Sequence, residues 1–293
     1  MKRKTKVRIA RFTRQVPILR EMQALRNESV LRLVVQAAFV GGCTGGVIGV
    51  FRWLYDHGNA WIVSTLRHGA NDLTTALIVF GTLTLLALIV GQMVRKEPLI
   101  SGSGIPQTEL ALAGQLPYPG FRIVASKFVG TLLSLSGGLS VGREGPSIQM
   151  GGAVGAGFHA LWRPAAPHAL TGSPYVVAGA VAGLAAAFGA PAAGVLFAFE
   201  EMKSRRDTSL IVAACASAIG AHLMIRIVFG MGRILPFAGF EAPPLSSFWI
   251  VALEGAVFGV LGVGYNKTLL WEVPEGGRYE KNPFKGNMDI EKL

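Results

Sequence analysis

The sequence predicts an all-α, polytopic membrane protein whose helices are tilted, broken and in part re-entrant. Hydrophobic residues make up 51% of the 293 residues and charged residues only 15%, against about 25% charged residues in soluble domains. The long apolar runs are repeatedly interrupted by Gly and Pro. This composition argues against a disordered chain, a nucleic-acid-binding arm with a small core, and most soluble enzymes.

Basic residues are concentrated at the amino terminus. Residues 2–26 carry nine Lys or Arg, and the whole chain has a formal net charge of +11. Because basic residues that flank membrane spans stay on the cytoplasmic side, segment 1–28 is expected to be cytoplasmic and to place the N-terminus inside. We attribute the positive charge to the orientation of the chain in the membrane, so we expect no nucleic-acid partner.

Known signatures of catalysis and metal binding are missing from the sequence. Cys43 and Cys215 both lie in apolar stretches, and the five histidines have no metal-ligand spacing. No nucleotide loop or nucleophile elbow occurs either. We therefore expect a protein that is not an enzyme and that holds no cofactor, disulfide framework or metal.

Apolar runs define a predicted membrane domain over residues 29–271, followed by a polar tail over 272–293. The first spans are expected at Leu31–Leu54 and Leu73–Val94, with the connection Asp56–Asp72 outside. Further runs lie at 121–141, 145–162, 174–199, 208–232 and 246–271. Short and broken runs are typical of transporters, where helix ends inside the membrane line a site.

Glycines recur at four-residue spacing, which allows helix backbones to approach closely in lipid. We assign these glycines a packing role and no chemistry. They are Gly41, Gly45 and Gly49; Gly42 and Gly46; Gly151 and Gly155; and Gly179 and Gly183.

The segment GSGIP at 102–106 predicts a helix start that could hold an anion. Pro106 suits the first turn of a helix, where its missing N–H costs nothing. The free amides and the positive end of the helix dipole then converge on one spot, and Ser103 adds a hydroxyl donor without charge. An ordinary serine cap would explain the same residues.

The segment GREGP at 142–146 repeats this arrangement before another apolar run. Glu144 lies between apolar stretches, where ionisable groups are rare and usually functional. A carboxylate placed where amides converge could occupy the binding site of an anion. Protonation would neutralise the carboxylate and free the site for the anion. A simple capping role at the helix dipole is the alternative.

Other charged residues in apolar surroundings are less specific. Glu200 and Glu201 end one long run, and either could be a second proton station on the cytoplasmic side or a polar helix end. Lys127 and Arg226 could extend to the membrane surface, and Glu254 could pair with one of them.

Taken together, these motifs resemble the CLC family of chloride channels and proton/chloride antiporters. The resemblance covers about residues 30–270 and rests on the order and spacing of the motifs. The motifs are GSGIP at 102–106, GREGPSIQMGG at 142–152, GLAAAFGAP at 183–191 and the Glu200-Glu201-Met202 that ends the same run.

The resemblance implies specific roles for individual residues. Glu144 matches the gating glutamate that competes with chloride, and Glu201 matches the inner proton-transfer glutamate of many antiporters. Ser103 and Arg143 stand where the fluoride-exporting branch has other residues, which favours chloride. The implied chloride-binding residues are Ser103, Gly104, Ile105, Arg143 and Gly145.

The family also implies architecture and function. The chain resembles the first of two inverted repeats, and the second-half segment G-x-F-x-P and the late pore-lining tyrosine are not found. We expect a homodimer in a bacterial inner membrane that transports chloride by proton-coupled antiport, incomplete as a single chain. The alternatives are a passive voltage- or pH-gated chloride channel and a non-transporting fragment or assembly subunit.

Overall fold

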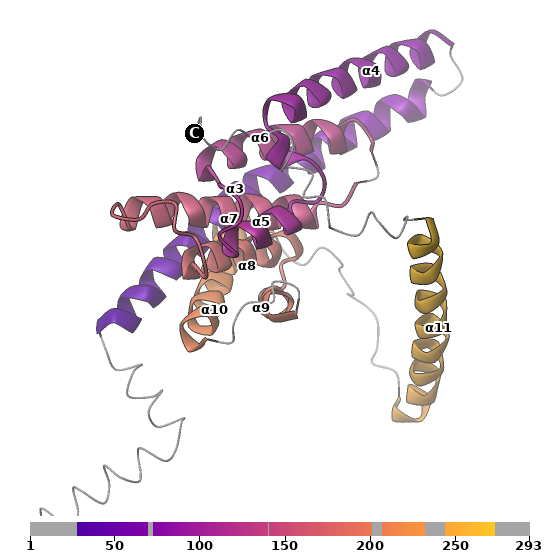
Figure 1. Ribbon diagram of the computed structural model, residues 1–293. Coiled ribbons are helices and arrows are strands. Elements are labelled where there is room, and N and C mark those ends of the chain that lie inside the picture. Colours follow the sequence, from indigo (N-terminus) through magenta and orange to yellow (C-terminus); the bar gives the residue numbers. More distant parts are fainter. Residues whose placement is uncertain (1–27, 70–72, 140, 201–206, 232–243, 273–293) are drawn as a thin grey trace, which may run out of the picture. The chain divides into compact units, whose positions relative to one another are not determined.

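The computed structural model describes residues 28–69, 73–139, 141–200, 207–231 and 244–272. Every regular element among these residues is a helix, which confirms the predicted all-α class (Figure 1). The chain divides into two compact units, Met1–Leu235 and Pro236–Leu293. The second unit contains the short 3₁₀ turn η3 (Leu245–Ser247) and the helix α11 (Phe248–Glu272).

The first unit holds the remaining helices. In chain order they are α3 (Glu28–Gly69), α4 (Leu73–Lys96), the 3₁₀ turn η1 (Pro98–Ile100), α5 (Ile105–Leu112), α6 (Gly120–Ser136), α7 (Glu144–Trp162), α8 (Pro174–Phe188), α9 (Pro191–Glu200), α10 (Thr208–Leu223) and the π-helical turn η2 (Met224–Val228).

Helix α3 is longer than the sequence predicts. The apolar run ends at Leu54, and the residues assigned to an external connection continue the same helix to Gly69. Hydropathy marks which residues suit lipid, whereas a helix continues as long as its backbone hydrogen bonds are uninterrupted. Residues 55–69 contain no proline to interrupt them.

The run predicted at 174–199 is divided into two helices. Gly189 ends α8 with a φ of 67°, a left-handed conformation that glycine adopts without steric cost. Pro191 then begins α9, at a first helical position that suits proline. The broken geometry expected of a transporter-like fold is therefore present within this run.

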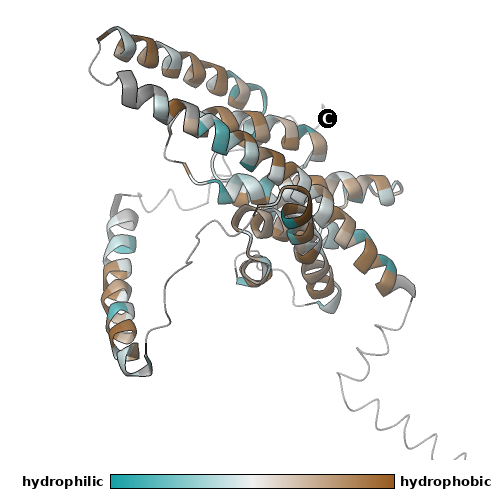
Figure 2. Ribbon diagram, turned by 180° about the vertical axis from the view of Figure 1, so that it is seen from behind, coloured by the Kyte–Doolittle hydropathy of each residue, from teal (hydrophilic) through white to brown (hydrophobic). Residues whose placement is uncertain are grey.

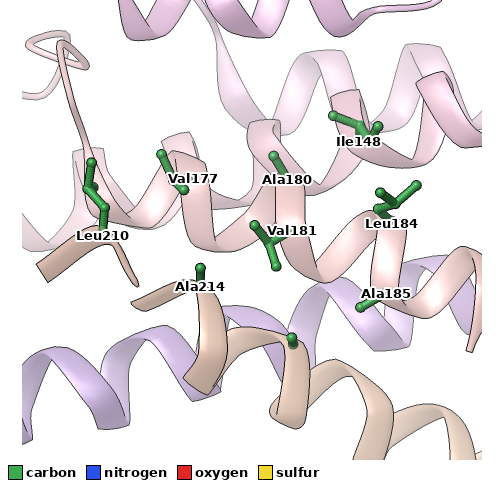
Figure 3. Close-up of a cluster of buried hydrophobic side chains, with 9 residues drawn as sticks. Ile148, Val177, Ala180, Val181, Leu184, Ala185, Leu210 and Ala214 are labelled. Carbon is green, nitrogen blue, oxygen red and sulfur yellow. The ribbon is translucent and has the colours of Figure 1, made fainter. Parts of the chain in front are cut away.

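Small and branched apolar side chains from α7, α8 and α10 form a buried hydrophobic cluster in the first unit (Figure 3). Residues 145–157 of α7 and 175–187 of α8 are all buried. Ile148 contributes from α7, and Leu210 and Ala214 contribute from α10. Helix α8 supplies Val177, Ala180, Val181, Leu184 and Ala185.

Helices α7 and α8 contact each other backbone to backbone through glycines. A Cβ added to Gly151 would overlap the carbonyl oxygen of Gly179, and a Cβ added to Gly183 would overlap that of Ser147. The predicted packing role of this glycine spacing is confirmed at this crossing.

Helix α3 crosses α10 in the same manner, but only some of its glycines take part. Gly41 and Gly45 abut the α10 backbone. A Cβ on Gly42 would meet only a methionine methyl group at 4.0 Å, and a Cβ on Gly46 would meet nothing within 4 Å. The four-residue repeat therefore identifies the helix face that packs, whereas the position of the partner helix decides which glycines contact its backbone.

Several helices expose apolar surface. Every residue of α4 is at least partly exposed within the described part of the chain, and Figure 2 shows hydrophobic residues along its outer side. Phe80 and Leu88, for example, are 71% and 64% exposed. Four described helices are long and apolar enough to cross a membrane, over Val30–Ala60, Leu73–Lys96, Thr208–Val228 and Phe248–Thr268.

Replacing Gly151 by Ala tests the glycine contact. The added methyl group has no space against Gly179, so the helices must separate, which we expect to cost about 1–3 kcal/mol in stability. The matched control is Gly46→Ala, where the space around the methyl group is open. Thermal unfolding of the purified protein in detergent should show a lower Tm for Gly151→Ala only. Equal Tm values for the two variants would contradict this packing.

Candidate functional site

Two helices of the first unit begin at loops rich in glycine, and neither is capped by the side chain of its N-cap residue. Helix α5 has Gly104 at its N-cap, with a φ of 93°, and Arg143 holds the same position in α7. Pro106 and Pro146 lie in the first turns, where prolines lack an N–H and leave neighbouring amides to find other partners.

The two helix starts meet at Ser103 and Gly145. A Cβ added to Gly145 would lie 2.6 Å from the carbonyl oxygen of Ser103 and 2.8 Å from its Cβ. Only glycine leaves room for this approach. The GSGIP and GREGP segments, about 40 residues apart in the sequence, are therefore parts of one site.

A cavity of about 650 Å³ lies beside this junction. Val90 and Val94 of α4 supply part of its apolar wall. Polar groups are contributed by the two helix starts and by α6, and they belong to Ser101, Ser103, Lys127, Thr131, Ser134 and Glu144.

Glu144 is half-buried at the first position of α7. Its carboxylate is folded back over the preceding loop. The evidence is that Oε2 of Glu144 fills the place where a Cβ on Gly142 would lie. The carboxylate thus lies at the amino end of its own helix, where the helix dipole stabilises a negative charge.

Lys127 of α6 holds the backbone of segment 99–102, which leads into the α5 start. Its Nζ donates to the carbonyl oxygens of Ile100 at 2.8 Å and Gly102 at 2.7 Å. The side chain is only 3% exposed. A buried ammonium group needs such acceptors, since burial without hydrogen bonds is very costly.

Two glutamines hold the other carbonyls of the same segment. Gln149 of α7 donates from Nε2 to Leu99 at 2.6 Å, and Gln107 of α5 donates from Nε2 to Ser101 at 2.8 Å. A Cβ added to Gly104 would overlap the Gln149 side chain. Four successive carbonyl oxygens are thus bonded by side chains from three helices.

This arrangement suits an anion. Helix starts carry a partial positive charge of about half an elementary charge each, and their free amides are natural anion ligands. The Ser103 hydroxyl is exposed and, within the described part of the chain, accepts a long hydrogen bond of 3.4 Å from the Ile105 amide. The hydroxyl proton is therefore free to point to a bound anion.

The structure brings most of the predicted site residues together. Ser103, Gly104, Ile105 and Gly145 lie at the junction of the two helix starts, and Glu144 lines the adjoining cavity. Arg143 is half-buried at the α7 N-cap. Glu200 ends α9 and is exposed, whereas Glu201 lies outside the described residues.

The interpretation of Lys127 as a side chain that extends to the membrane surface is wrong. Its ammonium group is buried and bonded to backbone carbonyls, because the neighbouring segment offers acceptors within reach. Arg226 is exposed, and Glu254 is exposed on α11. Sequence reasoning does not identify the roles of Gln107 and Gln149, since a glutamine beside an apolar run has no distinctive sequence signal. A lysine in the middle of an apolar run does have such a signal, because ionisable groups are rare there.

The family model for the voltage gated chloride channel matches residues 86–274. The H(+)/Cl(-) exchange transporter ClcA of Yersinia pseudotuberculosis is 35% identical over 255 residues, which are 83% of this chain and 52% of that protein. ClcA of Vibrio cholerae is 40% identical over 174 residues, or 59% of this chain and 37% of that protein. The chain thus spans about half the length of the first of these relatives, and less of the second.

A solved structure agrees with these similarities. The crystal structure of a slow cyanobacterial Cl⁻/H⁺ antiporter has 33% sequence identity and a TM-score of 0.70, covering 82% of this chain and 56% of that chain. The broken helices and the contact between two helix starts therefore occur in a fold shared with that antiporter.

Replacing Gly145 by Ala should separate the two helix starts. The methyl group would overlap the Ser103 backbone, so we expect amide hydrogen exchange in segment 102–105 to become about tenfold faster. Gly91→Ala in α4 is the matched control, because nothing lies within 4 Å of the added methyl group. Unchanged exchange in the Gly145 variant would contradict the contact.

Proposed function

This chain belongs to the voltage-gated chloride channel family, and we propose that it takes part in the exchange of chloride for protons across a membrane. The observation that carries the proposal is the junction of two helix starts, with Ser103 and Gly145 in contact beside a cavity that Glu144 lines. The relatives named as proton/chloride exchangers support the same activity.

In this proposal, chloride binds where the two helix starts converge. The Ser103 hydroxyl and the backbone amides around Gly104, Ile105, Arg143 and Gly145 are its ligands. Dipoles and hydroxyls without a full charge suit the groups that directly contact a transported ion, since binding must be favourable enough for entry and weak enough for release.

Glu144 couples chloride to protons because its carboxylate competes with chloride for the same binding site. When it is ionised, its carboxylate occupies the amides at the start of α7 and repels chloride. Protonation removes that negative charge, and chloride replaces the side chain. One residue thus exchanges a proton for an anion at a single position.

Further parts of the proposal follow the family. Glu201 is the second proton station on the cytoplasmic side. The protein is a homodimer with one pathway in each subunit, in a bacterial inner membrane with the N-terminus cytoplasmic. The nine basic residues in 2–26 support this orientation, and the four candidate spans support the membrane location.

Replacing Glu144 by Ala should remove the pH dependence of chloride binding. In the unmodified chain, chloride affinity should be higher in acidic than in neutral buffer, because protonation neutralises the competing carboxylate. In Glu144→Ala the affinity should stay high and change less than about twofold. Isothermal titration of the purified chain with chloride measures both values.

Glu254→Ala is the matched control, since Glu254 is exposed on α11; its pH dependence should equal that of the unmodified chain. A Glu144 variant that keeps the full pH response would refute the gating role. Failure of the unmodified chain to bind chloride at either pH would count against the chloride site itself.

Flux measurements separate exchange from passive conduction. The chain is reconstituted into liposomes alone and after co-expression with the carboxyl-terminal half of the Yersinia relative. Chloride flux that drives proton movement supports exchange. Chloride flux without proton movement favours a channel, and flux only with the added half favours an assembly subunit.

A further inference from the structure

We propose that Lys127 is a positioning residue for the anion site: it binds two carbonyl oxygens that would otherwise repel the anion, and it supplies the positive charge of the cavity. The inference deepens the proposed chloride site and rests on it. Lys127 lies on α6, whereas the chloride ligands lie at the starts of α5 and α7.

The first step is the electrostatics of segment 99–102. A carbonyl oxygen carries partial negative charge, and several carbonyls beside an anion site weaken anion binding. Ile100 and Gly102 line the cavity, and the carbonyl oxygens of both accept hydrogen bonds from the Lys127 ammonium group. The ammonium group therefore reduces the negative potential of these two carbonyl oxygens at the wall of the cavity, where that potential would repel the anion.

The second step is conformational. Gly102 has a φ of 67° and Gly104 a φ of 93°, so the backbone reverses sharply just before α5. Glycine does not restrict these angles by itself. The two hydrogen bonds from Lys127 link Ile100 to Gly102 across this reversal, which holds Ser103 and the first amides of α5 in one orientation.

The third step compares the three side chains that bind this segment. Gln149 and Gln107 each use an amide nitrogen on a carbonyl, and each leaves its own Oε1 buried with no hydrogen-bond partner within the described part of the chain. Leaving an acceptor unpaired is costly. The two glutamines thus bind segment 99–102 even though each leaves one buried oxygen without a hydrogen-bond partner in the described part of the chain.

The fourth step is the charge of the cavity. Among its described lining residues, Lys127 and Glu144 are the ones that carry a formal charge. Lys127 donates two N–H groups to Ile100 and Gly102, and an ammonium group has three. With Glu144 neutralised or displaced, the lysine charge is the one that attracts chloride.

The test measures hydrogen exchange by mass spectrometry on the full chain in detergent, with sodium chloride or with sodium isethionate. Exchange of segment 99–106 in isethionate reports loop order, and its slowing by added chloride gives the chloride affinity. In Lys127→Met we expect loop exchange about tenfold faster and chloride affinity about tenfold weaker.

Lys127→Arg keeps a positive charge and several N–H donors, so both values should return to within about threefold of the unmodified chain. Lys267→Met on α11 is the matched control and should change neither value. Unchanged values in Lys127→Met overturn the proposal. So does an arginine variant that behaves like the methionine variant while residues 175–187 of α8 stay protected.

A variant that unfolds is recognised by loss of protection in α8. In that case Lys127→Gln is compared with Lys127→Arg, because glutamine donates two N–H bonds without charge. We expect the glutamine variant to keep loop order and to bind chloride about tenfold more weakly than the arginine variant. Equal chloride affinities overturn the proposal.

The same data separate this inference from the proposed function. If chloride slows exchange in no protein, the unmodified chain included, the chloride site fails and loop exchange in isethionate alone decides whether Lys127 positions the segment. If chloride slows exchange equally in the unmodified chain and in Lys127→Met, the chloride site stands and the role of Lys127 fails.

Discussion

The backbone contact between α7 and α8 is the interaction on which the rest of the first unit depends. The two helices meet through glycines such as Gly151 and Gly179, with no side chain between them. Residues 145–157 of α7 are buried, because α6, α5 and α3 pack against the helix as well. One end of this rigid helix carries Glu144 and Gly145, and its middle carries Gln149. The position of α7 therefore sets the place of the Glu144 carboxylate, the contact with Ser103 and one of the bonds to segment 99–102.

Around the site, the two kinds of backbone group have different partners. The carbonyl oxygens of 99–102 are bonded by side chains from α5, α6 and α7. The amides at the starts of α5 and α7 have no capping side chain from their N-cap residues. Inside a membrane every backbone polar group needs a partner within the protein or at a site. Carbonyls bound by protein and amides without a capping side chain are the arrangement that the proposed anion site requires.

The tertiary contacts also explain why residues of one type have different importance. Gly41 and Gly46 belong to overlapping repeats on α3, yet only Gly41 abuts the backbone of α10. Lys127 and Arg226 both interrupt apolar runs, yet Lys127 is buried against carbonyls and Arg226 is exposed. Composition and spacing are the same in each pair, and the difference lies in the element packed against the residue.

The all-α class, the apolar helices, the glycine packing faces and the two helix starts with Ser103 and Glu144 can be predicted from the sequence, because these features depend on local composition and spacing. The length of α3 cannot be predicted in this way, since hydropathy does not report where helical hydrogen bonding ends. The contact of Ser103 with Gly145, and the bonds from Lys127, Gln107 and Gln149 to the segment before the site, are visible only in the folded chain. Those contacts join residues from separate helices, and a hydrogen bond between distant residues depends on how the helices pack.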